Sequence, residues 1–176
     1  MVSPPDVTWV CLVYRVPREP STPRIAVWRR LRALGVAQLG DGVVALPEDP
    51  RTREHLEWVA DRVLGAGGTA LLLQARTLTR HDERELARTM ARARAQEYRD
   101  LAREADVAAR TGLVAGDATR TATRLRRALR AVQRRDYFPP PERDEAVRAV
   151  REAVDLLREP VTPAAARSTP GAGGPA

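Results

Sequence analysis

Residues 8–16, with the sequence TWVCLVYRV, decide the fold because they form a nearly unbroken run of apolar, β-branched and aromatic side chains. Such a run predicts a central strand buried on both faces. The loop that follows, residues 17–23 (PREPSTP), opens a helix that Ser21 or Thr22 can cap and in which Pro23 suits the first turn. Gly35 ends this helix, whose apolar stripe consists of Val27, Trp28, Leu31 and Leu34.

Two further strands and a second helix complete a recognisable order. Asp41-Gly42 between the apolar runs 36–39 and 43–46 predicts a hairpin turn. A helix from about Asp49 then precedes a last strand at residues 69–75, and its inward side chains are Leu56, Val59, Ala60 and Val63. The order strand, helix, strand, strand, helix, strand predicts an α+β fold with a ferredoxin-like βαββαβ domain over residues 8–78.

The remainder of the chain has no strand pattern and is rich in Ala, Arg, Glu and Leu. Its apolar periodicity predicts an α-helical extension over residues 79–159, with a break near 112–116 and amphipathic helices at about residues 80–110, 117–135 and 142–158. Residues 160–176, rich in proline, alanine and glycine, predict a disordered tail.

All thirty basic residues are arginine, and the net charge of +7 is concentrated. Residues 15–32 carry six arginines against Glu19 alone, and residues 117–135 carry seven against Asp117 alone. Two such clusters indicate a polyanion or a small oxyanion as partner, beyond general solubility.

Other functional classes find little support in the composition. Cys11 is the only cysteine and His55 and His81 are the only histidines, so neither an intramolecular disulfide nor a metal site is expected. No nucleophile lies beside a base, and we expect neither an enzyme nor a cofactor. No apolar run approaches the ~20 residues that span a bilayer, and without a secretory signal the expected location is the cytoplasm.

The first arginine cluster surrounds the predicted start of a helix, where free N–H groups and the helix dipole attract anions. An oxyanion site is therefore predicted at Arg15, Arg18, Ser21, Thr22 and Arg24. The alternative is an ordinary helix start whose arginines pair with Glu19 or Asp41 or face solvent, and charge and spacing alone favour this alternative.

The second cluster forms a row on the helix predicted at residues 117–135, opposite its apolar stripe of Leu125, Leu129 and Val132. A DNA-binding surface is predicted there from Arg120, Arg124, Arg127, Arg130 and Arg134. The alternative is a solvated face that pairs with the acidic helix at residues 142–158, and the pattern does not decide between the two.

Several of these stretches also resemble a known family. Residues 12–24 and 27–31 are similar to the opening signature of the amino-terminal domain of the bacterial chromate-resistance regulators, the ChrB family. Asp41-Gly42-Val43, Leu46-Pro47, Gly67-Gly68 and the run Arg135–Phe138 continue the likeness, which covers residues 8–158. A more distant likeness is to the central domain of the phenylacetate-degradation repressors and to the small CRISPR-adaptation nuclease subunit.

The resemblance implies a chromate-responsive transcriptional regulator with DNA and chromate, or a similar oxyanion, as partners, and the distant relatives imply a homodimer. Full-length regulators carry a second, carboxy-terminal domain that we do not expect in this chain. The nuclease subunits have a metal-binding aspartate at the end of the first strand, where this sequence has Tyr14 and Arg15, which argues against nuclease activity. The alternatives are an arginine-rich protein-interaction module without a ligand and an enzyme acting on an oxyanion or phosphorylated substrate.

Overall fold

The central strand of the sheet is the apolar run with which the described part of the chain opens. The computed structural model describes residues 7–111 and 113–158. β1 (Trp9–Arg15) lies between β3 (Val43–Pro47) and β4 (Thr69–Ala75), and β2 (Ala37–Gly40) completes the sheet beyond β3. All three pairings are antiparallel, in the order β2-β3-β1-β4. The predicted α+β fold and the predicted order of strands and helices along the chain are confirmed.

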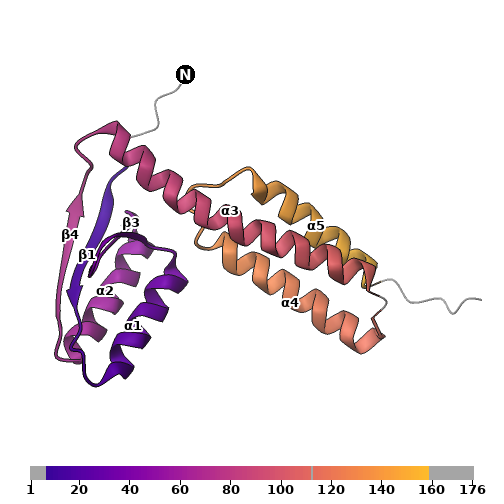
Figure 1. Ribbon diagram of the computed structural model, residues 1–176, viewed down its shortest axis with the longest axis horizontal. Coiled ribbons are helices and arrows are strands. Elements are labelled where there is room, and N and C mark those ends of the chain that lie inside the picture. The colour runs from indigo at the N-terminus through magenta and orange to yellow at the C-terminus, as the bar shows by residue number, and fades with distance from the viewer. Residues whose placement is uncertain (1–6, 112, 159–176) are drawn as a thin grey trace, which may run out of the picture.

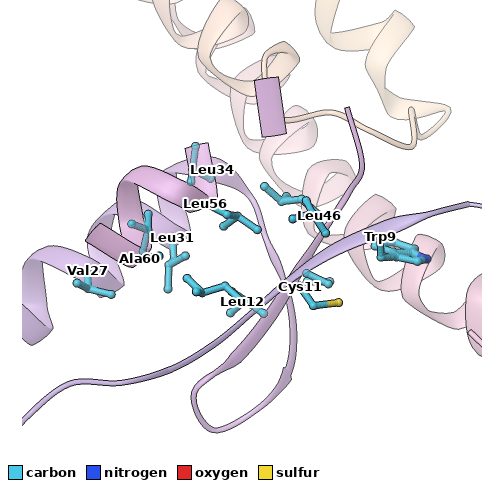
Figure 2. Close-up of a cluster of buried hydrophobic side chains, with 14 of the residues drawn as sticks. Trp9, Cys11, Leu12, Val27, Leu31, Leu34, Leu46, Leu56 and Ala60 are labelled. Carbon is cyan, nitrogen blue, oxygen red and sulfur yellow. The ribbon is translucent and has the colours of Figure 1, made fainter. Parts of the chain in front are cut away.

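Two helices cover one face of this sheet. α1 (Ser21–Leu34) and α2 (Pro50–Gly65) lie side by side against it (Figure 1). Figure 2 shows Leu12 of β1 on the side of Leu31 and Ala60 from these helices. The side chains that form this core are almost fully removed from water: Leu12, Val27, Leu31, Val44, Leu46, Leu56, Val59 and Val63. Their burial supplies the main driving force for this part of the fold.

The opposite face of the sheet is only partly covered. Trp9 and Cys11 point away from α1 and α2, and both are buried (Figure 2). Trp9 packs against Phe138, with 5.9 Å between the ring centroids, and α3 (Arg80–Arg110) contacts β2. Farther along the same face, Val13 of β1 and Leu71 and Leu73 of β4 are exposed. The prediction that the first strand is buried on both faces therefore holds only for its first half.

α3 continues into a three-helix bundle with α4 (Ala115–Gln133) and α5 (Glu142–Leu156) (Figure 1). The residues described between 80 and 158 contain helices and connecting turns but no strand, as predicted. The bundle core includes Tyr98, Leu101, Ala105, Leu125, Val132, Ala146, Val150 and Val154. The predicted tail at residues 160–176 lies outside the described residues.

Two predictions about α1 are wrong. Neither Ser21 nor Thr22 caps the helix, because both already belong to its first turn and Pro20, which has an extended backbone, occupies the N-cap position. A proline offers no side-chain acceptor, so no side chain caps α1. Trp28 is 54% exposed and does not belong to the buried stripe with its neighbours Val27 and Leu31.

Candidate anion-binding surfaces

The arginine row of α4 faces solvent along its whole length. Arg120, Arg124, Arg127, Arg130 and Arg134 are all exposed, while Leu125 and Val132 on the other side of the helix are buried in the bundle. Successive α-helical residues are about 100° apart, so this row and this stripe follow from one amphipathic pattern. The surface therefore exists as predicted, whereas its binding of DNA remains a prediction.

Within the row, the five side chains are not equivalent. Arg120 forms an ion pair with Asp117 of its own helix, and Arg124 forms one with Glu104 of α3. Among the residues that the structure describes, the side chains of Arg127 and Arg130 have no ion-pair or hydrogen-bond partner. The same holds for Arg134, which follows the last turn of α4 as its C-cap. These three guanidinium groups retain all of their donors for an external partner.

The alternative of pairing with the acidic helix α5 is not realised. In the described structure, no ion pair joins the row to α5. Glu142 in the first turn of α5 instead accepts a 2.5 Å hydrogen bond from Arg99 of α3. The positive charge of α4 is thus left largely uncompensated by the bundle that carries it.

The arginines around the start of α1 are also exposed. Arg18 and Arg24 form no ion pair with Glu19 or Asp41, nor with any other carboxylate of the described chain, and no side chain caps the helix. Arg15 differs, because strand alternation places it on the same sheet face as Val13 and Cys11, opposite α1. An anion held at the start of α1 would therefore be contacted by Arg18 from the preceding loop and by Arg24 from the first turn of the helix.

A third basic surface, which the sequence did not indicate, lies between α1 and α2. Arg30 and Arg62, one from each helix, line a groove of about 270 Å³ together with Val27, Trp58 and Val59. Trp58 is 67% exposed. Sequence periodicity locates each residue on its own helix but does not show which faces of two helices meet.

The feature that sequence reasoning missed most clearly is a buried polar junction between the sheet and the bundle. Arg94 of α3 is 8% exposed and donates a 2.8 Å hydrogen bond to Glu97, whose other oxygen accepts one of 2.5 Å from Arg135. Burial lowers the pKa of Arg94, while the charge of Glu97 acts in the opposite direction. A Cβ at Gly35 would lie 2.6 Å from Arg94 Nη1, so the end of α1 packs directly on this guanidinium.

The run Arg135–Phe138, which carries part of the family resemblance, takes part in two further hydrogen bonds of this junction. Tyr98 donates a 2.8 Å hydrogen bond to the fully buried side chain of Asp136, and Tyr137 donates one of 3.2 Å to the carbonyl of Leu34. Burial and the Asp136 bond raise the pKa of Tyr98, and burial raises that of Tyr137. In this chain the motif therefore connects the two parts of the molecule.

Comparison with known proteins agrees with the resemblance read from the sequence. Residues 24–109 match the family model described as "Protein ChrB, N-terminal". These residues belong to the ChrB N-terminal domain family. The match runs from the first turn of α1 to the end of α3, so the ChrB N-terminal domain includes both helices of the sheet layer and the long connecting helix.

A curated relative carries the same name. The chain is 30% identical over 166 residues to Protein ChrB of Cupriavidus metallidurans, and the alignment covers 92% of this chain and 51% of that protein. The chain thus spans about half the length of this relative. No solved structure matches significantly. In the described part of the chain, none of the helices is long and apolar enough to cross a membrane.

Proposed function

We propose that this chain is a regulatory module of chromate resistance that binds the phosphate backbone of DNA through α4. The observation that carries the proposal is the set of three exposed arginines, Arg127, Arg130 and Arg134, whose guanidinium groups have no partner in the described structure. Phosphate contacts supply most of the non-specific affinity of proteins for DNA. A helix anchored by Leu125 and Val132 presents such contacts on a fixed surface.

The test is a titration with DNA from the promoter region of the chain's own gene at several salt concentrations. The slope of log affinity against log salt reports the number of phosphates neutralised, by about 0.9 per contact. Replacing Arg127 and Arg130 by alanine should make the slope shallower by nearly two units on every DNA sequence.

The matched control removes the same number of charges from the same helix. Arg120→Ala with Arg124→Ala deletes the two arginines that are already ion-paired, and the slope should change much less. Equal effects of the two double variants would show that only the total positive charge of α4 matters and that Arg127 and Arg130 make no particular phosphate contacts. An unchanged slope in both would contradict DNA binding by α4 and would favour the alternative function, contact with an acidic protein.

The regulatory signal in this proposal is an oxyanion at the start of α1. Chromate is a compact dianion at neutral pH, and sulfate has nearly the same shape. Arg18, Arg24 and the N–H groups near Ser21 and Thr22 offer charge-assisted donors without a carboxylate partner in the described chain. Arg15 would act from the neighbouring strand end only by reaching around the sheet.

Ligand binding to the folded state raises thermal stability by mass action. Chromate or sulfate should therefore raise the melting temperature of the parent chain, and Arg24→Ala should abolish the rise. Arg29→Ala is the control, because Arg29 is also exposed on α1 but lies beyond the first turn of the helix. Absence of any anion-dependent shift in the parent would remove the oxyanion from the proposal and leave DNA binding to be judged separately.

A further inference from the structure

The outer edge of β4 is the longest open strand edge in the described sheet. β4 ends the order β2-β3-β1-β4 and pairs only with β1 among the described strands. Its seven residues, TALLLQA, contain no charge and no proline, and it pairs with β1 without a bulge. Soluble proteins usually protect such edges with charges, prolines, bulges or short strands, because the free N–H and C=O groups pair readily with another strand.

The opposite edge shows what a protected edge looks like in the same sheet. β2 has only four residues and a register irregularity between Gln38 and Gly40. Short length and irregular pairing both discourage addition of a further strand there. The β4 edge can therefore accept a further strand, whereas the β2 edge is protected against one.

An apolar surface accompanies the open edge. Leu71 is 56% exposed and Leu73 is 44% exposed, and their register with Val13 and Cys11 of β1 puts them on the sheet face that α1 and α2 leave uncovered. Val13 of β1, the register partner of Leu71, is 37% exposed beside them. Edge and surface adjoin, so a strand added at the edge would bring its own side chains beside Leu71 and Leu73.

We propose that β4 pairs antiparallel with β4 of a second copy of this chain, which joins two four-stranded sheets into one of eight strands. A register centred on Leu72 pairs all seven residues and places Leu71 opposite Leu73 of the other copy. Both then lie on the same face of the sheet, since they differ by two positions. The pairing is its own two-fold partner, as a closed dimer requires.

Other occupants fit less well. The stretches outside the described residues are interrupted by proline, at Pro4 and Pro5 near one end and at Pro160, Pro163, Pro170 and Pro175 near the other. Proline lacks the N–H that a ladder needs. A charged partner strand would find no charge on β4 to pair with, whereas an identical strand brings apolar side chains opposite apolar side chains.

The first experiment measures the mass of the full chain in solution by sedimentation equilibrium. The parent chain should be dimeric, and Leu71→Lys should reduce its mass to that of one copy while its circular dichroism stays unchanged. Leu39→Lys is the matched control, because Leu39 is 45% exposed on the other edge strand, and this variant should remain dimeric. A monomeric parent, or equal effects of the two lysines, would overturn the proposal.

A second experiment tests the register and does not depend on the folding of a lysine variant. The native Cys11 is buried, so an introduced thiol is the accessible one. A mixture of Leu71→Cys and Leu73→Cys chains should form cross-linked dimers on mild oxidation, in excess over either variant alone. Equal cross-linking in all three samples would contradict the register centred on Leu72, and none at all would contradict pairing of the β4 edges.

Discussion

At the scale of single residues, Asp136 is a buried acidic group of the junction. Its side chain is fully buried, and only one of its two oxygens has a hydrogen-bond partner among the described residues. That partner is the Tyr98 hydroxyl, and Arg143 adds an ion pair to the same oxygen at 3.7 Å, which is too long for a hydrogen bond. A buried carboxylate that loses its donor loses the compensation for its desolvation.

Tyr98→Phe should therefore destabilise the protein by about 1–3 kcal/mol, the usual cost of leaving a buried polar group unpaired. Chemical unfolding monitored by circular dichroism measures the change. Tyr14→Phe is the control, because the Tyr14 hydroxyl has no hydrogen-bond partner in the described structure and its removal should cost little. Equal losses in both variants would show that the Asp136 bond contributes nothing.

The same residue predicts a pH dependence. The pKa of Tyr98 is raised in the folded protein, first by burial and then by the bond to Asp136. In the unfolded chain a tyrosine ionises near pH 10, so its contribution is fully present below about pH 10 and is lost as the pH rises further. Stability should fall above pH 10, and the fall should be smaller in Tyr98→Phe. An identical alkaline profile would contradict this assignment.

At the scale of elements, the start of α2 is fixed by its own residues, unlike that of α1. The Asp49 side chain accepts a 2.7 Å hydrogen bond from Thr52 N–H, and the Thr52 hydroxyl oxygen accepts one of 2.9 Å from Asp49 N–H. Asp49→Ala should cost about 0.5–2 kcal/mol in thermal unfolding. Asp61→Ala, an exposed change on the same helix, should stay within about 0.5 kcal/mol. The prediction is wrong if both changes cost the same.

This contrast explains how far the sequence predicts the elements. Apolar periodicity and the Asp41-Gly42 turn are local signals, and they gave the strands, the helices and their order correctly. The cap of α1 was missed because the dihedral angles of Pro20, rather than the presence of Ser21 or Thr22, decide where that helix begins. The exposure of the α4 row was predictable, because one amphipathic pattern contains both its faces.

At the scale of the whole molecule, contacts between distant segments were not predictable. Neither the covering of the sheet by α3 nor the packing of Trp9 on Phe138 leaves a periodic signal in either stretch. The same reason hid the Arg94, Glu97 and Arg135 cluster, whose members appear in the sequence as ordinary charges of amphipathic helices. Among the candidate site residues, the pairing of Arg120 and Arg124 depends likewise on which helices become neighbours.

These long-range contacts predict that sheet and bundle unfold together. Tryptophan fluorescence and far-ultraviolet circular dichroism should give one coincident thermal transition, because Trp9 reports on the contact and the helices dominate the dichroism. Phe138→Ala should lower the midpoint. The loss of unfolding free energy should be smaller than the roughly 3–5 kcal/mol typical of a fully buried phenylalanine, because Phe138 is only partly buried. Two separate transitions in the parent would instead show that the two parts are independent domains.

The length of α3 affects the direction in which the arginine row of α4 faces. Its 31 residues form a rod of about 46 Å that begins beside the sheet and ends in the bundle. Each residue inserted in such a rod advances everything beyond it by about 1.5 Å and turns it by about 100°. The number of residues in α3 therefore sets the direction in which the α4 row faces relative to the sheet. Seven inserted residues would preserve that direction to within about 20°, whereas two would point the row to nearly the opposite side.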